Sequence, residues 1–178
     1  MSIPLPPYTF IPGHWPHPCC TPEGHSYGLE PIPAEPLALE TWTECGAYLH
    51  GIVLFNAGYY WEAHELWEEV WKALGRRGIT AELLKGLIKL GAVGIKIRQG
   101  RPKAAQSLLR RSREHFESVA LNHSDEVAGL NLTQLIAWAA PFSETVPALR
   151  ADPTLPVEVV LPPLPGAAST IDPAESAT

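Results

Sequence analysis

Hydrophobic residues recur at steps of three and four positions through the middle of the chain, which is the spacing of one face of an α-helix. On this basis five helices are predicted, over about 41–57, 59–74, 80–99, 102–119 and 131–140, with a weaker helical stretch over 143–149. No segment alternates apolar and polar residues as a half-buried strand does. The pattern therefore predicts an all-α fold, an antiparallel bundle of about five helices.

Residues at the ends of these stretches suit helix termini. Thr41 to Glu44 reads as a capping box for the first helix, and Thr80 is expected to cap the third. Pro102 suits the first turn of the fourth helix, where its missing N–H costs nothing. Pro141 is expected to interrupt the fifth helix.

Prolines divide the chain into three parts. Ten of the 19 lie in residues 1–36, eight in 141–178, and only Pro102 lies between. We therefore expect a Pro-rich extended arm over 1–36, a helical bundle domain over 37–150 and a largely disordered tail over 151–178, of which only residues 157–161 would dock. Because the arm carries four aromatic residues, it is expected to lie on the bundle. These are Tyr8, Phe10, Trp15 and Tyr27.

Charge is segregated along the chain as well. Residues 1–71 hold nine acids and no Lys or Arg, whereas residues 72–124 hold twelve bases and three acids. An acidic block beside a basic one favours mutual neutralisation over a nucleic-acid surface. No apolar run is long enough for a membrane helix, and three cysteines are too few for a disulfide framework. A cytoplasmic protein is expected, and a homo-oligomer remains open.

The candidate chemistry lies in the second helix. Its sequence places four carboxylates, one histidine and three tryptophans within residues 61–71. His64 and Glu68 are neighbours on one helix edge and could hold a divalent metal such as zinc or manganese between them. The string His64-Glu65-Leu66-Trp67-Glu68 narrowly misses the H-E-x-x-H zinc motif, since Glu68 replaces the second histidine. Such a site could recruit His50, His115 or a carboxylate from another helix.

A purely structural interpretation competes with this one. If the second and third helices form a hairpin centred near residue 77, Glu69 faces Lys85 and Glu65 faces Lys89, which predicts two interhelical ion pairs. His64 could then be a partly buried imidazole bonded to Glu68 or to a backbone carbonyl. The tryptophans would be core residues.

Two further candidates lie outside this helix. The arm contains five residues of metal-ligating type, although adjacent cysteines rarely ligate one metal together. These are His14, His17, Cys19, Cys20 and His25. The fourth helix carries several bases that could contact phosphate, with a solvated face as the alternative. These are Arg101, Lys103, Arg110, Arg111 and Arg113.

The second helix and the residues just before it also carry a family resemblance. The motif F-N-x-G-x-Y-x-E-A-H-E-x-W-E-x-x-W runs from Phe55 to Trp71. It resembles the signature of an uncharacterised prokaryotic family known as domain of unknown function 309, and Lys85 to Ile88 resembles its second block. The resemblance covers about residues 40–120 and departs from the family at Lys89, where Gln is common. It implies a small helical bundle, sometimes described as a predicted metal-dependent hydrolase.

Three functions follow as hypotheses. The first is a non-catalytic binding or assembly module built around a cluster of polar and aromatic side chains. The second is a metal-dependent hydrolase with His64 and Glu68 on the metal and Glu65 as the catalytic residue. The third is a basic hairpin that binds phosphate or RNA, with nucleic acid the less favoured partner. The polar network or pocket of the first hypothesis comprises Tyr60, Glu62, His64, Glu65, Glu68, Trp71 and Lys89.

Overall fold

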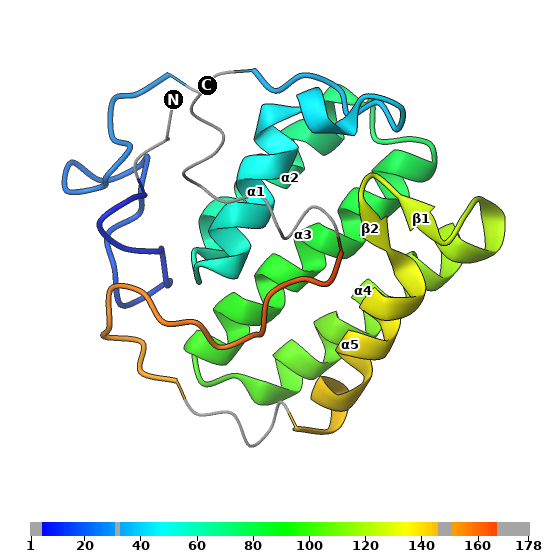
Figure 1. Cartoon of the computed structure of the whole chain (residues 1–178). Helices are drawn as coiled ribbons and strands as arrows, with labels where there is room; N and C mark the ends of the chain where they lie inside the picture. Colours follow the sequence, from blue (N-terminus) through cyan, green and yellow to red (C-terminus); the bar gives the residue numbers. More distant parts are fainter. Residues whose placement is uncertain (1–4, 31–32, 146–150, 167–178) are drawn as a thin grey trace.

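The computed structural model describes residues 5–30, 33–145 and 151–166. Successive helices pack on one another as a bundle (Figure 1), which confirms the predicted all-α class. The α-helices are α1 (Gly46–Asn56), α2 (Tyr60–Ala73), α3 (Ile79–Arg98), α4 (Pro102–Asn122) and α5 (Leu132–Thr145). A short 3-10 helix, η1 (Trp42–Glu44), precedes α1, and β1 (Glu126–Val127) pairs antiparallel with β2 (Leu130–Asn131) before α5.

Helix ends differ from the predictions at three places. Thr41 forms no side-chain cap, because η1 intervenes and α1 begins only at Gly46. Thr80 lies inside the first turn of α3, whose cap is Gly78 with a φ of 91°. Pro141 does not end α5, which continues to Thr145. The prediction for α4 is confirmed, with Pro102 in its first turn.

Glycines let α2 and α3 approach closely. A Cβ at Gly94 would meet the ring of Tyr60, and a Cβ at Gly91 would lie 2.9 Å from the Tyr60 carbonyl oxygen and 3.0 Å from the Cβ of His64. Residues 60 and 94, and 64 and 91, therefore face each other, as a hairpin centred near residue 77 requires. Trp67 is fully buried against α1, where its indole N–H donates to the carbonyl of Tyr48 at 3.2 Å.

The predicted interhelical ion pairs are wrong even though the register is right. Glu69 pairs instead with Lys72 on its own helix, at 2.8 Å, and Lys85 pairs with Glu82 at 3.1 Å. Within the part of the chain that the structure describes, neither Glu65 nor Lys89 forms an ion pair. The reason is the face that α3 turns to α2, which carries Gly91 and Gly94, whereas Lys89 lies close enough to Arg111 of α4 to interact with its charge.

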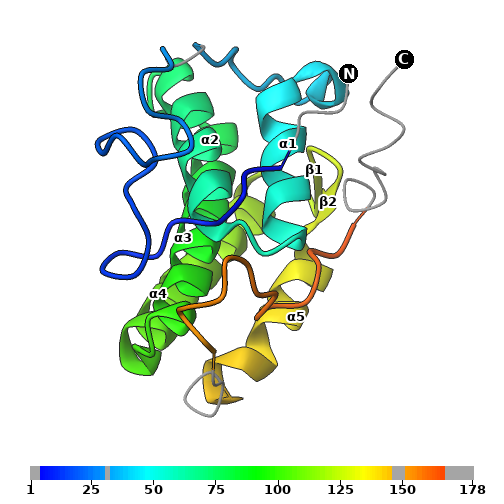
Figure 2. The ribbon, with the colours of Figure 1, turned by 90° about the vertical axis from the view of Figure 1, so that its left-hand side faces the viewer.

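The segments before and after the bundle lie against it. Figure 2 shows the N-terminal segment beside α2. In that segment Tyr8 and Phe10 are buried as expected, whereas Tyr27 is 53% exposed. The backbone N–H of Thr9 donates to the carbonyl of Pro156 at 2.9 Å, so the segments before and after the bundle also touch each other.

Residues 151–166 cross the ends of three helices. The Tyr60 hydroxyl on α2 accepts hydrogen bonds from the backbone of Val160 and Leu161, both at 2.9 Å, and Arg98 at the end of α3 donates to the carbonyls of Asp152 and Leu155. In the stretch 157–161 that was expected to dock, Leu161 is buried and Val159 is 55% exposed. Docking extends further than predicted, however, because Leu164 is buried too and its N–H reaches Asn56 of α1. The last dozen residues lie outside the described part.

None of the described helices is both long enough and apolar enough to cross a membrane.

Candidate functional site

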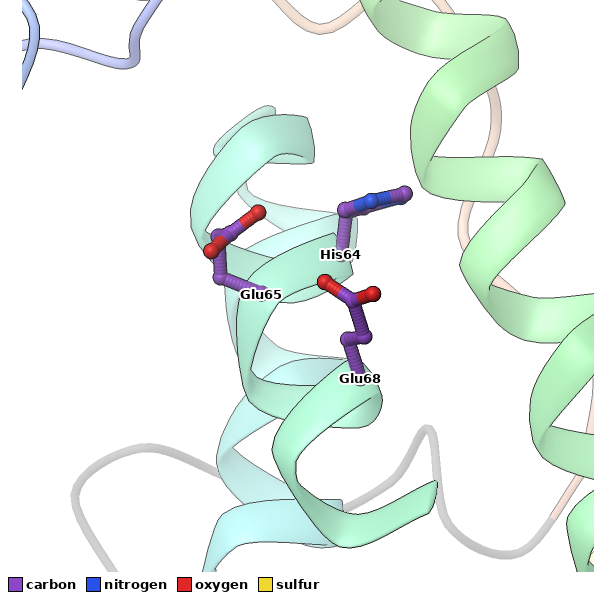
Figure 3. Close-up of side chains that lie close together, drawn as sticks. All are labelled: His64, Glu65 and Glu68. Carbon is purple, nitrogen blue, oxygen red and sulfur yellow. The ribbon is translucent and has the colours of Figure 1, made fainter. Parts of the chain in front are cut away.

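Three side chains of α2 form the only grouping in the described residues that could hold a metal ion. One ligand atom each from His64, Glu65 and Glu68 lies within 4.8 Å of the other two. His64 and Glu68 leave the same edge of α2, and Glu65 occupies the neighbouring position (Figure 3). This grouping follows from helix geometry, since residues four apart are one turn apart and adjacent residues differ by about 100°. We call it the His-Glu-Glu cluster.

His64 is oriented by the neighbouring helix. Its Nδ1 lies 2.9 Å from the backbone carbonyl oxygen of Ile88 on α3. Because a carbonyl only accepts, Nδ1 carries the proton and Nε2 keeps its lone pair. A histidine held in this way by a carbonyl on one nitrogen is a common arrangement for metal ligation through the other. The same bond also satisfies the purely structural interpretation of His64.

The two glutamates of the cluster differ in environment. Burial raises the pKa of Glu65, nearby His64 opposes that rise, and the negative charge of Glu68 adds to it. Glu68 is more accessible, with its side chain 33% exposed and its carboxylate 3.7 Å from Lys72. All three residues are partly exposed, so an ion and a water molecule could reach them.

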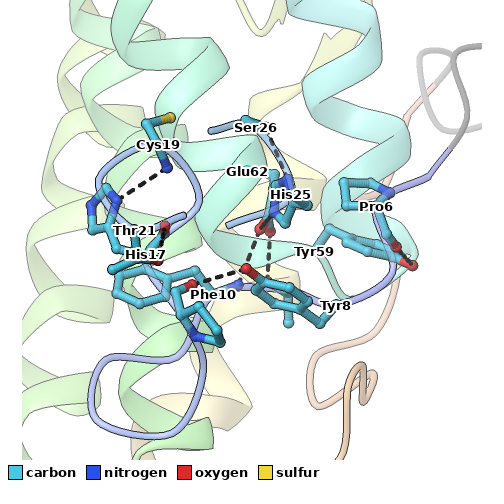
Figure 4. A network of polar contacts seen from close by, with 12 residues as sticks. Pro6, Tyr8, Phe10, His17, Cys19, Thr21, His25, Ser26, Tyr59 and Glu62 are labelled. Carbon is cyan, nitrogen blue, oxygen red and sulfur yellow. Dashed lines mark hydrogen bonds and ion pairs between the residues drawn. The ribbon is translucent and has the colours of Figure 1, made fainter. Parts of the chain in front are cut away.

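Glu62, one turn before the cluster, is held by the N-terminal segment. Its carboxylate accepts from the Thr9 hydroxyl at 2.6 Å and from the Phe10 backbone N–H at 3.0 Å. His25 Nε2 lies 3.3 Å away (Figure 4), and both side chains are only 8% exposed. Trp61 also contacts the N-terminal segment, because its ring lies edge-on to the ring of Phe10 with centroids 5.4 Å apart. Residues 5–30 therefore contact α2 through a buried carboxylate and through the ring of Trp61.

Other predicted site residues lie in different surroundings. Tyr60 bonds the 151–166 segment, as described above. Trp71 has a buried indole N–H with no partner in the described residues, and the guanidinium of Arg76 lies 5.3 Å from its ring centroid. Burial lowers the pKa of Lys89, and the charges of Lys85 and Arg111 lower it further.

The histidines expected as additional ligands do not join the His-Glu-Glu cluster. His115 contacts Glu82 at 2.5 Å, and His50 has a buried Nε2 without a partner in the described residues, where burial lowers the pKa of the ring. His17 accepts the backbone N–H groups of Cys19 and Cys20 through Nδ1, at 3.3 and 3.2 Å. His25 contacts Glu62. His17 and His25 of the arm therefore contact different groups.

Sequence reasoning missed the partners of Glu62. No pattern in the sequence marks Thr9 for a role, and the arm offers His25 only as a candidate metal ligand. The Phe10 contact uses a main-chain N–H, which the identity of a residue does not reveal. The one signal in the sequence was general: aromatic residues in a proline-rich segment predicted docking without showing onto which carboxylate.

The comparisons with known proteins agree with the motif. A family model described as Domain of unknown function (DUF309) matches residues 48–108, which confirms the resemblance over a shorter range than the expected 40–120. The match contains α2 with the His-Glu-Glu cluster, all of α3 and the beginning of α4, and it excludes the N-terminal segment. The comparison with curated proteins found no match, and neither did the comparison with solved structures.

Proposed function

We propose that this chain, whose residues 48–108 carry the DUF309 match, is a binding module that holds a divalent metal ion through His64, Glu65 and Glu68. The observation that carries the proposal is the convergence of one imidazole and two carboxylates within 4.8 Å. Zinc and manganese are both bound by such nitrogen and oxygen donors.

The donor set fits an ion of this size. Ligands about 2.1 Å from a tetrahedral zinc ion lie about 3.4 Å apart, so movements totalling about 1.4 Å by the partly exposed side chains would bring even a pair 4.8 Å apart into range. The hydrogen bond from His64 to the carbonyl of Ile88 supports the proposal further, because it fixes the orientation of the imidazole ring, as partners of metal-ligating histidines do. Two carboxylates on a positive ion also relieve the repulsion between Glu65 and Glu68.

Isothermal titration of the full chain with zinc and with manganese tests the proposal. The titration is done on a Cys19→Ser, Cys20→Ser background, so that thiols of the arm cannot account for binding. We expect one ion per chain, with affinity reduced at least about tenfold in His64→Ala and in Glu68→Gln, since each removes one ligand.

Glu69→Gln is the matched control, because Glu69 is a neighbouring helix carboxylate that pairs with Lys72 and lies outside the cluster. Its affinity for the ion is expected to match that of the unchanged chain. An equal loss in Glu69→Gln and Glu68→Gln would show general attraction to an acidic helix, and absence of binding would end the proposal.

A metal-dependent hydrolase is the second candidate. The small number of candidate ligands favours it. In the described residues only three side chains, all from one helix, form the cluster. An ion held by them would keep coordination positions open for water and a substrate. A divalent ion in such an open site supplies Lewis-acid chemistry. In this version His64 and Glu68 hold the ion and Glu65 accepts a proton from water.

One variant separates the two candidates. Glu65→Gln should weaken metal binding if Glu65 is a ligand of the binding module. If Glu65 is instead a general base, the variant should keep its metal affinity and lose manganese-dependent hydrolysis of p-nitrophenyl esters or phosphates. Absence of any such hydrolysis by the unchanged chain leaves the binding module alone.

A further inference from the structure

One edge of the α3–α4 interface carries charged residues at helical spacing from both sides. On α3, Glu82, Lys85 and Lys89 are three and four residues apart and so share one edge of the helix. On α4, Arg111 and His115 are four apart and share an edge as well. The contact between His115 and Glu82, at 2.5 Å, shows that these two edges face each other.

Two contacts fix how the edges are aligned. His115 meets Glu82, and the hydroxyl of Ser112 donates to the backbone carbonyl of Gly86 at 2.8 Å. Residue numbers of facing positions on the two antiparallel helices therefore sum to about 198. Arg111 consequently lies opposite the stretch of α3 that contains Lys89, next to Lys85 one turn away.

Some of the basic residues near Arg111 form ion pairs with carboxylates, and others do not in the described residues. On α4, Arg110 pairs with Glu114 at 3.8 Å and Arg113 pairs with Glu117 at 3.3 Å, each four residues ahead. The residue four ahead of Arg111 is His115, which is already engaged with Glu82. In the described ranges, Arg111 forms no ion pair.

Lys89 on α3 resembles Arg111 in having few candidate partners for an ion pair. Its neighbours three and four residues away are Lys85, Gly86, Ala92 and Val93, so its own helix offers no carboxylate. No ion pair or side-chain hydrogen bond of Lys89 occurs in the part of the chain that is described. Its side chain is half-buried, and its pKa is lowered first by that burial and then by Lys85 and Arg111. The nearby charge of Glu82 opposes these effects but forms no ion pair with Lys89 in the described residues, so a half-buried ammonium lies close to two cations without a direct ion-pair partner there.

We propose that Lys85, Lys89 and Arg111 form a binding site for a compact oxyanion, the phosphate group of a small molecule. A phosphate oxygen accepts from ammonium and guanidinium donors alike. Lys85 already pairs with Glu82 at 3.1 Å, so the phosphate would mainly offset the positive charges of Lys89 and Arg111. Glu82 bounds the site on one side, and Glu114 and Glu117 lie further along α4. These acids disfavour an extended polyanion such as RNA, which would have to pass over them. The site is separate from the His-Glu-Glu cluster and does not depend on a bound metal.

Titration with inorganic phosphate tests the site, with melting temperature and calorimetry as readouts. Sodium chloride at equal ionic strength is the reference, so that general screening cancels. We expect phosphate to raise the melting temperature of the full chain above the chloride reference. Lys89→Gln and Arg111→Gln should each weaken phosphate binding at least about tenfold, and the double variant should abolish it.

Arg110→Gln is the matched control, since Arg110 is the adjacent base on α4 and already pairs with Glu114. It should bind phosphate as the unchanged chain does. A loss in Arg110→Gln equal to that in Arg111→Gln would overturn the site, as would the absence of any phosphate effect beyond that of chloride.

Two further readouts keep the proposal falsifiable. In phosphate-free buffer Lys89→Gln should melt no lower than the unchanged chain, because it removes a cation that has no partner; a large decrease would mean that Lys89 has a structural role instead. A single-stranded RNA oligonucleotide should bind no more tightly than its individual phosphates. Tight RNA binding with a salt dependence that indicates release of more than about three counterions would replace the compact site by an extended nucleic-acid surface.

Discussion

Removal of the Glu62 carboxylate should release the N-terminal segment from α2. Glu62 is 7% exposed and is the shared acceptor for the Thr9 hydroxyl, the Phe10 N–H and His25. Thr9 is fully buried, so its hydroxyl cannot turn to water while the segment stays docked. The variant Glu62→Ala would leave these donors without an acceptor.

The size of the effect follows from the donors. Each buried donor left without a partner costs about 1 to 3 kcal/mol. The Thr9 hydroxyl and the Phe10 N–H together therefore give a loss of about 2 to 6 kcal/mol if the segment remains in place. Detachment of the segment limits the loss to the free energy of docking, because water then satisfies the donors. Glu62→Ala is expected to lower the free energy of unfolding by up to this amount and to expose residues 5–30.

Limited proteolysis and urea denaturation together measure both effects. We expect cleavage within residues 5–30 to become much faster in Glu62→Ala while the helical bundle stays intact. Glu69→Ala is the control, because Glu69 is a partly exposed carboxylate of α2 whose only ion-pair partner in the described residues is Lys72, and it should change stability by less than about 1 kcal/mol. A Glu62→Ala chain with unchanged proteolysis and unchanged unfolding would refute the role assigned to this carboxylate.

Two other predictions concern α3. Gly94→Ala places a Cβ against the Tyr60 ring and should lower the free energy of unfolding by about 1 to 3 kcal/mol in urea denaturation, whereas Gly46→Ala, with open space around its Cβ, should cause no loss. Burial raises the pKa of Glu82, but hydrogen bonds from His115 and a neighbouring lysine outweigh it, so that the pKa is lowered overall. Its stabilising contribution is present above the usual glutamate pKa of about 4.3 and is lost as the pH falls through the lowered value. Glu82→Gln should therefore lower the melting temperature at pH 7 and make little difference well below pH 4; a constant difference across this range would contradict the assignment.

Much of the bundle could be predicted because helix periodicity is a local property of the sequence. The α2–α3 register also followed from the chain, since a short connection near residue 77 leaves few alternatives. The ion pairs assigned on that register failed for a reason that is not local. Gly91 and Gly94 bring α3 onto Tyr60 of α2 and turn Lys85 and Lys89 away. Register alone does not fix the rotation of a helix about its axis, which depends on which face packs most closely.

Two helix ends show the limits of cap motifs. The capping box at Thr41 competes with η1, and Gly78 rather than Thr80 begins α3 because its positive φ ends the preceding turn. Pro141 illustrates the converse, because α5 continues past it to Thr145. Such outcomes depend on the path of the neighbouring chain, which the local pattern does not contain.

Part of the candidate site could likewise be predicted from the sequence, and part could not. The proximity of His64 to Glu68 could be expected from their spacing on one helix. The bond from His64 to the carbonyl of Ile88 on α3 and the hold of the N-terminal segment on Glu62 could not, because they join residues 24 and more than 35 positions apart. Main-chain groups take part in both, and any residue type provides them.

The most direct test of the proposed metal site is an anomalous-difference map from crystals of the full chain grown with zinc or with manganese. The account predicts one peak on α2, within about 2.3 Å of a ring nitrogen of His64 and of a carboxylate oxygen of Glu68. That peak should be absent in crystals of His64→Ala. A peak at Cys19 and Cys20 instead, or none on α2 at saturating metal, would contradict the account.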